Sequence, residues 1–372
     1  MKRSLIRIIS VLLAVSLMVC SFAGCNKEKI ETPDESTTKS PTEESTSDVG
    51  VIETPENVNP LTGIADLSDE AIGARPIAIM VENSPAARPQ WGLSTPDIVI
   101  EGVAEGGITR MLWVYADKAK IPDRVGPTRS ARHDFVELAR GMDAIFVHWG
   151  GSDGSRVGLT LGYQAIKNLG VNNIDQMTNA GSFFTRDGSR AAPHNGIISG
   201  DSIKSAIIKM GYRTKTVSND WRPYGVAVEG KNPTSTNIEA CSEITVTFST
   251  GFSHTFKYNS TDNKYYNYLN GKLMTDGNDG SAMAVENVIT LYVPVTTLNT
   301  KEGHKEWNLE VTNGEGYYVS NGVGQKIYWS KAGKSAPLEI KDINNNELII
   351  NNGQVWMGFV PTATQNLTKV IA

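Results

Sequence analysis

The chain has 372 residues, enough for about two domains, and its 40% hydrophobic and 20% charged content is ordinary for globular protein. A formal net charge of -5 without a basic stripe excludes general binding to nucleic-acid backbones, which depends on clustered lysine and arginine. Of the three cysteines, Cys20 and Cys25 lie in the amino-terminal segment, so Cys241 alone remains in the folded part. We therefore expect no internal disulfide and no zinc cluster.

The amino terminus has the pattern of a secretory signal. Lys2, Arg3 and Arg7 give it a positive charge, and residues 8–19 are almost wholly apolar. This apolar run is shorter than the roughly 20 residues of a membrane-spanning helix, so a signal peptide is the better interpretation. An uncleaved anchor is the alternative.

The end of this signal resembles that of bacterial lipoproteins. Small Ala23 and Gly24 directly precede Cys25, whereas Phe22 stands where leucine is usual. Residues 1–24 are thus predicted to be a lipoprotein signal peptide, and Cys25 the lipidated residue; an ordinary signal peptide remains the alternative. Since two acyl chains suffice for stable anchoring, we expect the mature protein on the extracytoplasmic face of the cell membrane.

A stalk is predicted at residues 25–58. This segment is rich in Ser, Thr, Glu, Asp and Pro and contains no aromatic residue. Such a composition cannot bury enough apolar surface to offset the entropy of ordering, so we expect it to be disordered. It would hold the folded part away from the membrane.

An α/β domain is predicted at residues 59–230. Continuous apolar runs at 77–81, 97–101, 109–116 and 144–148 indicate strands buried on both faces. A helix is expected after Pro127, with Ser130 as its cap and an end near Gly141. Its core-facing stripe is formed by Phe135, Leu138, Ala139 and Met142. A second helix is predicted at 202–210, ended by Gly211, and residues 150–200 are expected to be rich in loops. Buried strands that alternate with helices favour an α/β layer fold with a mostly buried sheet.

A mostly β domain is predicted at residues 231–372, in the form of a small barrel or sandwich. Short β-branched runs alternate with Asn-Gly turns at 270–271, 313–314, 321–322 and 352–353, which are strong hairpin signals. Aromatic bulk comes from Tyr265, Tyr266, Tyr268, Tyr328, Trp329 and Trp356. These rings either pack a sheet core, which is the commoner role of strand aromatics, or form a stacking platform for sugars.

A candidate anion site lies at the predicted helix start. Arg129 and Arg132 bracket Ser130 there, and free backbone N–H groups at a helix amino terminus favour negative charge. Arginine would add planar, paired donors. The alternative is that both arginines pair with the protein's own acids or face water.

Further polar residues lie near the ends of the predicted strands. Arg110 follows two glycines, and Glu82, Glu101 and Glu105 lie at or just beyond strand ends, where ligands collect in open α/β sheets. These carboxylates either pair with the arginines or serve as acid and base. His148 closes a strand before two glycines and Ser152, and is either a ligand-binding or a buried structural histidine. His194 and Asn195 lie on a loop, where function is commoner.

No motif identifies a catalytic or cofactor site. A Ser-His-Asp arrangement could draw on Ser130 or Ser152 with His148 or His194, but the sequence has no G-x-S-x-G elbow. Nucleotide-binding loops and metal-binding patterns are also missing from the sequence, so no cofactor and no metal are predicted, and a catalytic residue cannot be assigned.

Several ordered sequence blocks resemble one family, the YerB-like lipoproteins of Gram-positive bacteria. They are NPLTG at 59–63, RPIAIMVEN at 75–83, ARPQWGLS at 87–94, EGGITR at 105–110, GPTRSAR at 126–132, HWGGS at 148–152 and PHN at 193–195. The carboxy-terminal likeness is looser. The resemblance implies a lipid-anchored extracytoplasmic protein with two tandem domains of unknown function, and no established activity.

The resemblance also implies a set of candidate ligand-binding positions. They are Glu82, Asn83, Glu105, Arg110, Arg129, Ser130, Arg132, His148, Ser152, Arg186, His194 and Asn195. The chain departs from the family pattern at Ile100, where tyrosine is expected, at Thr128, and at Thr95-Pro96. Any role of a tyrosine hydroxyl at position 100 is therefore in doubt.

Three functions are compatible with these features. The first is binding of an anionic cell-envelope ligand, a glycan carboxylate or phosphate, or of an envelope partner protein. The second is a hydrolase or transferase that acts on a phosphate ester or glycan of the cell envelope. The third is a structural scaffold whose polar residues only join two domains. We expect a membrane association through lipidated Cys25 and no nucleic-acid partner.

Overall fold

Two β-sheets carry most of the chain in the computed structural model, which describes residues 56–218, 220–227 and 238–372. The predicted signal peptide, Cys25, nearly all of the predicted stalk and the predicted boundary at 230–231 lie outside these residues. The described residues belong to a single unit, Glu53–Ala372. Within them, none of the helices is both long enough and apolar enough to cross a membrane.

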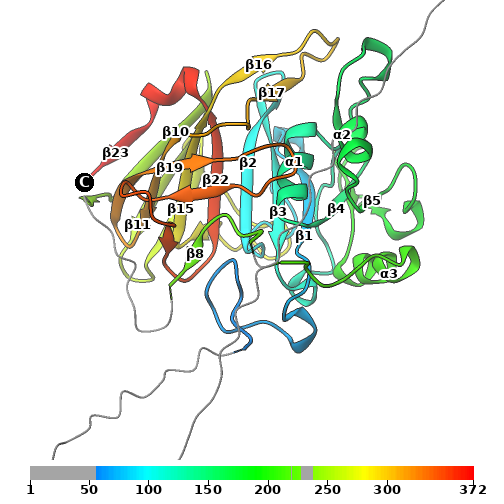
Figure 1. The fold of residues 1–372 in the computed structure, drawn as a ribbon, viewed down its shortest axis with the longest axis horizontal. Helices are drawn as coiled ribbons and strands as arrows, with labels where there is room; N and C mark the ends of the chain where they lie inside the picture. The colour runs from blue at the N-terminus through cyan, green and yellow to red at the C-terminus, as the bar shows by residue number, and fades with distance from the viewer. Residues whose placement is uncertain (1–55, 219, 228–237) are drawn as a thin grey trace, which may run out of the picture. The chain divides into compact units, whose positions relative to one another are not determined.

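The main sheet combines strands from both halves of the chain (Figure 1). Its order is β20-β19-β18-β15-β22-β2-β3-β1-β4-β5, and a short β9 (Glu239–Ala240) pairs with β19. The amino-terminal half supplies β1 (Ile77–Glu82), β2 (Ile98–Glu105), β3 (Ile108–Tyr115), β4 (Ile145–His148) and β5 (Asn173–Asp175). The carboxy-terminal half supplies β15 (Asn287–Val293), β18 (Gly314–Ser320), β19 (Val323–Ser330), β20 (Glu339–Lys341) and β22 (Val355–Pro361).

The two halves meet in the middle of this sheet. β22 pairs in parallel with β2, in a register that sets Ile98 opposite Val355 and Gly102 opposite Phe359. β1 and β2 both run antiparallel to β3, and β4 runs parallel to β1. The carboxyl ends of β1, β2 and β4 therefore lie at the same edge of the sheet, which is where polar side chains were expected to gather.

The second sheet belongs to the carboxy-terminal half. Its order is β13-β12-β11-β10-β23, with β14 on β12. The strands are β10 (Glu243–Ser249), β11 (Phe252–Asn259), β12 (Lys264–Leu269), β13 (Lys272–Leu273), β14 (Ala284–Val285) and β23 (Lys369–Ile371). Short pairs complete the strands: β6 (Thr185–Arg186) with β7 (Gly196–Ile197), β8 (Gly225–Val226) with β21 (Ile349–Ile350), and β16 (Val295–Thr297) with β17 (Lys305–Trp307).

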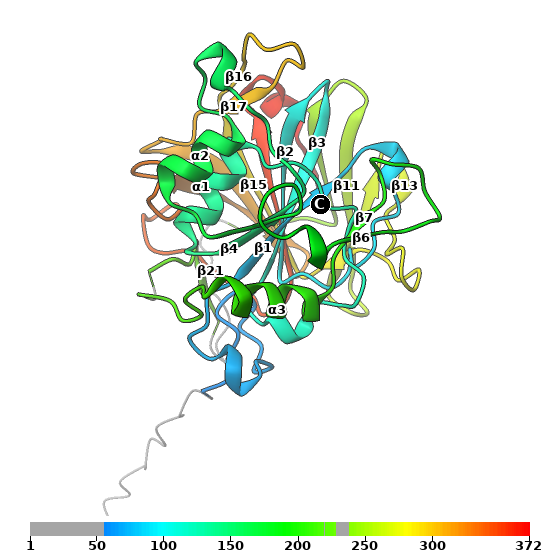
Figure 2. The same cartoon turned by 90° about the vertical axis from the view of Figure 1, so that its right-hand side faces the viewer.

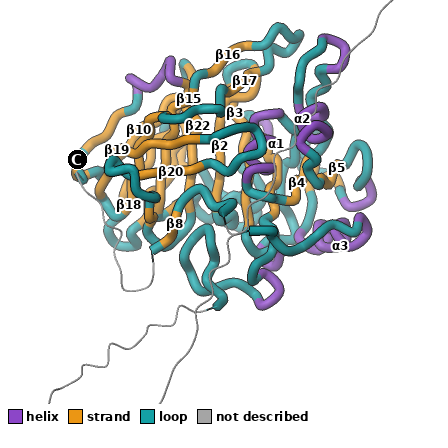
Figure 3. The backbone as a smooth tube through the Cα atoms, in the orientation of Figure 1, coloured by secondary structure: helices purple, strands orange, loops and turns teal. Residues whose placement is uncertain are grey.

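The α-helices gather near β4 and β5 (Figures 2 and 3). They are α1 (His133–Gly141), α2 (Gly162–Leu169) and α3 (Gly200–Met210), and α1 packs on α2. Short 3-10 helices are η1 (Asp69–Ala71), η2 (Pro85–Ala87), η3 (Lys118–Lys120), η4 (Ser155–Val157), η5 (Gly181–Phe183) and η6 (Thr362–Leu367). The expected fold class is confirmed: the amino-terminal half is mixed α/β with parallel strands, and the carboxy-terminal half is mostly antiparallel β.

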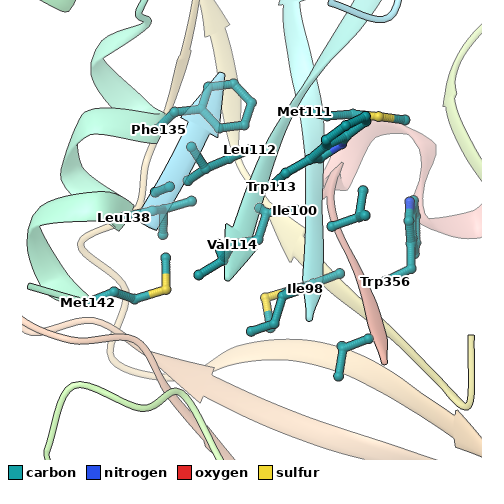
Figure 4. Packing of buried hydrophobic residues seen from close by; sticks show 14 of the residues in the cluster. Ile98, Ile100, Met111, Leu112, Trp113, Val114, Phe135, Leu138, Met142 and Trp356 are labelled. Atoms are coloured by element: carbon teal, nitrogen blue, oxygen red, sulfur yellow. The ribbon is translucent and has the colours of Figure 1, made fainter. Parts of the chain in front are cut away.

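Alternating side chains pack both faces of the central strands. Figure 4 shows Phe135 and Leu138 of α1, and Met142 directly after it, directed toward the strands, with Leu112 nearby, as the predicted stripe requires. On the other face, Trp356 of β22 contacts Phe256 of β11, with ring centroids 4.7 Å apart. This aromatic contact joins the two sheets. Full burial of each such side chain contributes about 1.5–3 kcal/mol, so both faces stabilise the strands that position the polar edge.

The structure corrects two local expectations. α1 begins at His133 with Arg132 as its N-cap and no side-chain cap, so Ser130 does not cap it. Glu101 lies inside β2 rather than at its end, because the strand continues to Glu105. Residues 150–200 are rich in loops, as expected, and also contain α2, in which only Gly162 and Ala165 are buried.

Two of the predicted Asn-Gly turns are confirmed as hairpin turns. Asn270-Gly271 joins β12 to β13, and Asn321-Gly322 joins β18 to β19, with positive φ at all four residues. Asn-Gly tolerates this conformation best, which explains the signal. By contrast, Asn352-Gly353 precedes β22, whose partners β15 and β2 are both distant in sequence and parallel to it, so this dipeptide is not a hairpin turn.

Candidate functional site

A short extended segment at residues 128–131 lies across the carboxyl ends of β1 and β4. It forms bridges through Thr128 to Val81 and through Ala131 to Gly151. The Arg129 backbone N–H donates to the Met80 carbonyl over 3.0 Å. Arg129 and Ser130 are therefore held at the polar edge of the sheet by the backbone, four and three residues before α1 begins.

Glu82 is the centre of the first polar cluster. Its side chain is buried at the end of β1, and Oε1 accepts hydrogen bonds from Nδ1 of His194 and from Oγ of Ser84, both over 2.8 Å. The other oxygen, Oε2, lies 3.5 Å from Nε of Arg129 and accepts no hydrogen bond in the described chain. One buried carboxylate thus holds a histidine and an arginine side by side.

This cluster leaves donors available to a ligand. The Arg129 side chain is 27% exposed, and its only ionic partner among the described residues is Glu82, through Nε. Its terminal nitrogens have no hydrogen-bond partner there. The His194 side chain is 28% exposed, and because Nδ1 is used by Glu82, its Nε2 remains open. Ser130 is half-buried, and its hydroxyl likewise has no partner in the described part of the chain.

Arg186 and Asn195 form the outer side of this cluster. The guanidinium group of Arg186 stacks on the Trp149 ring at 4.4 Å and donates to Oδ1 of Asn195 over 2.7 Å. Asn195 in turn donates to the carbonyls of Asp187 and Arg190, so it holds the loop that carries His194. Arg186 is exposed, which adds a second positive charge near Arg129 and His194 against the single carboxylate of Glu82.

Glu105 is the centre of a second cluster, which is ionic and closed. Its Oε2 and Oε1 accept from Nε and Nη2 of Arg132, each over 2.9 Å, and Oε1 also accepts from Arg110. Both arginines also donate to backbone carbonyls, Arg110 to that of Ser130 and Arg132 to that of Ala131. The side chains of Arg110 and Arg132 are nearly buried. These two arginines therefore stabilise the fold by pairing with the protein's own acid, which was the alternative to ligand binding.

The pKa of Glu105 reflects this enclosure. Burial alone would raise the pKa, but the guanidinium groups of Arg110 and Arg132 outweigh it and hold the pKa at about 2. The pKa of Arg110 is lowered to about 10, first by burial and then by neighbouring Arg132. Glu105 and Arg110 therefore stay charged at neutral pH.

Three other candidates are structural. Asn83 is fully buried and donates to Glu101 and Thr109. His148 is also fully buried, with Nδ1 2.7 Å from the Gly150 carbonyl and Nε2 3.0 Å from Nδ2 of Asn173. Burial lowers the pKa of His148, which keeps the ring neutral. The Ser152 hydroxyl accepts from the Gly162 backbone at the start of α2.

The structure thus divides the predicted site residues into three groups. Glu82, Arg129, Ser130, Arg186, His194 and Asn195 lie in or beside the open cluster, Glu105, Arg110 and Arg132 form the closed cluster, and Asn83, His148 and Ser152 are buried in the fold. Sequence reasoning missed Ser84 and Trp149 as members of the open cluster. Ser84 directly follows the Glu82-Asn83 pair, and Trp149 directly follows His148, so proximity to predicted strand ends could have indicated both.

The geometry does not form a catalytic triad. Oγ of Ser84 lies 3.5 Å from Nδ1 of His194, the same nitrogen that Glu82 contacts. In a Ser-His-acid triad, the serine and the acid occupy opposite ring nitrogens. Nor does any group of three or more His, Cys, Asp and Glu side chains suit a metal ion within the part of the chain described.

Comparisons with known proteins agree on one family. The amino-terminal domain model "Protein of unknown function (DUF3048) N-terminal domain" matches residues 61–213, and the corresponding C-terminal domain model matches 244–357. "Putative lipoprotein YerB" of Bacillus subtilis (strain 168) is 32% identical over 317 residues, which cover 82% of this chain and 84% of that protein. A crystal structure of YerB protein from Bacillus subtilis matches with a TM-score of 0.69 and 28% identity, over 84% of this chain and 99% of that one.

Proposed function

Because the chain belongs to the YerB-like family with tandem DUF3048 domains, we propose that it is a lipid-anchored extracytoplasmic protein that binds an anionic cell-envelope ligand through the open cluster of Arg129 and His194. Support for the anchor comes from the name of the relative and from the signal pattern that ends at Cys25. Support for the ligand comes from the geometry of the cluster.

One observation carries the ligand proposal. Arg129 presents terminal nitrogens that no described group accepts from, while Oε2 of Glu82 lies 3.5 Å from its Nε as an ionic contact without a hydrogen bond. An arginine with open terminal nitrogens offers a planar pair of donors, which matches a carboxylate or phosphate. His194 adds an open Nε2, and Arg186 adds charge at the rim. We propose a carboxylate or phosphate group on an envelope glycan as the bound moiety.

Binding of purified envelope fragments tests this proposal. The probes are muropeptides, which carry carboxylates, and glycerol phosphate oligomers, which carry phosphates. We expect Arg129→Leu to weaken binding of one probe at least tenfold, because a hydrogen bond to a charged group contributes about 1.5–3 kcal/mol. Arg156→Leu is the matched control, since Arg156 is exposed on η4 and forms no ion pair with the cluster among the described residues. Equal affinities of wild type and Arg129→Leu for both probes would refute the site.

A second candidate function is favoured by the contact between Glu82 and His194. A carboxylate that accepts from Nδ1 orients an imidazole and leaves Nε2 free to take or give a proton, as general acid–base catalysis requires. With Arg129 beside it, the cluster could support a hydrolase or transferase that acts on a phosphate ester or glycan of the envelope. Release of p-nitrophenol from bis(p-nitrophenyl) phosphate measures this activity. Turnover in wild type that persists unchanged in His194→Gln would contradict a role for the dyad.

A further inference from the structure

We propose that a second pocket, between the loop after β1 and the β12–β13 hairpin, binds a small carboxylic acid with an apolar body and a hydrogen-bond donor. The pocket has a volume of about 240 Å³. It is lined by Pro85, Arg88, Pro89, Gln90, Leu269, Lys272, Leu273, Met274 and Thr275. Both family domains contribute to it, and three of its residues belong to the ARPQWGLS block, which the open cluster does not use.

Two cationic side chains at this pocket lack an acidic partner among the described residues. Arg88 makes a single hydrogen bond in the described chain, from Nε to the Ser84 carbonyl over 3.3 Å. Lys272 is exposed and forms no ion pair there. Burial lowers the pKa of Arg88, and the negative charge of Glu101 partly opposes this effect. Glu101 itself contacts Asn83, Thr109, His254 and Trp356. The positive charges at the pocket are therefore not neutralised by a contacting carboxylate.

Gln90 provides an unpaired acceptor, which favours a ligand with a hydrogen-bond donor. The side chain is fully buried, and Nε2 donates to the Glu82 carbonyl over 3.1 Å and to Oδ1 of Asn83 over 2.8 Å. These two acceptors fix the orientation of the amide. Its Oε1 has no hydrogen-bond partner in the described chain, although it is buried. Oε1 has almost no exposed surface, so a ligand N–H or O–H reaches it only by displacing the neighbouring side chains, and it would then satisfy an acceptor whose missing donor costs about 1–3 kcal/mol.

The other residues that line the pocket determine which kind of group the rest of the ligand should carry. Pro85, Pro89, Leu269, Leu273 and Met274 are apolar, so an aliphatic group would be favoured. The pocket volume of about 240 Å³ suits a small molecule rather than a long polymer as the buried part. A planar carboxylate suits the guanidinium fork of Arg88. An N-acylated aliphatic amino acid combines the carboxylate, the N–H donor and the apolar body.

N-acetyl-L-leucine is a suitable probe, followed by ligand-observed NMR with the full-length protein. We expect Arg88→Gln and Lys272→Gln each to weaken its binding at least fivefold, and the double variant to abolish it. N-acetyl-L-leucinamide, which lacks the charge, should bind at least tenfold more weakly than the acid. The ester analogue 2-acetoxy-4-methylpentanoic acid, which lacks the N–H, should also bind more weakly, because it leaves Oε1 of Gln90 unpaired.

The controls separate this pocket from the open cluster and from misfolding. Arg129→Leu should leave N-acetyl-L-leucine binding unchanged, because Arg129 does not line this pocket. Lys326→Gln, an exposed lysine at a different cavity, should do the same. Since Lys272 is exposed, Lys272→Gln tests the charge without disturbing the core. Failure of the wild-type protein to bind the probe, or wild-type affinity in the Arg88→Gln and Lys272→Gln double variant, would overturn the proposal.

Discussion

Arg132 meets Glu105 through two parallel hydrogen bonds of 2.9 Å, Nε to Oε2 and Nη2 to Oε1. This arrangement is the strongest geometry available to an arginine and a carboxylate. It explains why Arg132, although it precedes a helix, has little capacity for an external anion. Arg110 completes the cluster from β3, so a single carboxylate holds two arginines at the polar edge of the sheet.

Replacement of Glu105 should therefore cost stability. We expect Glu105→Gln to lower the free energy of unfolding by about 3–5 kcal/mol at pH 7, because two nearly buried arginines lose their counter-charge. The pKa of Glu105 is about 2 in the folded protein against 4.5 ordinarily, so its contribution is complete above pH 4.5 and is lost as the pH falls toward 2. Urea denaturation at pH 7, 4.5 and 3 measures both effects.

The matched control for that experiment is Glu339→Gln. Glu339 is exposed, and its pair with Lys341 at 3.8 Å is a surface contact, which contributes about 0–1 kcal/mol. This variant should keep the wild-type acid dependence, whereas Glu105→Gln should show a shallower loss of stability between pH 4.5 and 3. An identical acid dependence in Glu105→Gln and wild type would show that the ion cluster does not stabilise the fold.

The sequence predicted the strands better than the site, for a physical reason. Continuous apolar runs such as 77–81 can only be accommodated in the core, so β1 was predictable from local pattern. The distribution of arginines was not predictable, because Arg129 and Arg132 lie three residues apart yet bind Glu82 and Glu105 from different strands. Whether an arginine is paired with an acid or available to a ligand depends on which carboxylates the fold places beside it. Those carboxylates are distant in sequence, so local residue spacing does not predict the pairing.

The joining of the two halves was also beyond local pattern. Glu101 of β2 contacts Nε2 of His254 on β11 over 3.0 Å and Nε1 of Trp356 on β22 over 3.1 Å. Glu101 was predicted to lie at or just beyond a strand end, whereas Glu101 and His254 are both fully buried. Their partners lie more than 150 positions away in sequence, and only the fold brings them together. The domain boundary near 230 stays a prediction, although one sheet contains strands from both sides of it.

Removal of the His148 side chain should destabilise the fold much more than removal of the His194 side chain. His148→Ala would remove two hydrogen bonds of a fully buried ring, to the Gly150 carbonyl and the Asn173 amide, and leave a cavity, so we expect a loss of about 2–4 kcal/mol in the free energy of unfolding. His194→Ala removes a 28% exposed ring, so the loss should be about 1 kcal/mol or less. Thermal and urea denaturation of both variants measure the difference. Comparable losses would mean that His194 is as structural as His148.

His133 should act as an acid-sensitive residue of the fold. Burial, followed by the positive charges of Lys334 and His304, lowers its pKa to about 4, and neither ring nitrogen has a hydrogen-bond partner in the described chain. Since the pKa in the unfolded chain is near 6.5, protonation favours unfolding, and stability falls as the pH drops from 6.5 toward 4. We expect His133→Phe to remove up to about 3 kcal/mol of this loss. Urea midpoints at pH 7 and 4.5 test it; equal shifts in variant and wild type would contradict it.

Cys25 should determine whether the protein sediments with membranes. The proposed lipid supplies two acyl chains, and each buried CH₂ contributes about 0.8 kcal/mol, so loss of the thiol should release the protein. We expect Cys25→Ala to move most of the protein from the membrane fraction to the soluble fraction or to leave an uncleaved precursor, which a mass measurement distinguishes. Cys241→Ala is the control, because Cys241 is a buried thiol that donates to the Glu243 carbonyl. If Cys25→Ala is processed to its mature mass and yet stays fully in the membrane fraction, another segment must hold the protein there, and the lipoprotein assignment fails for this chain.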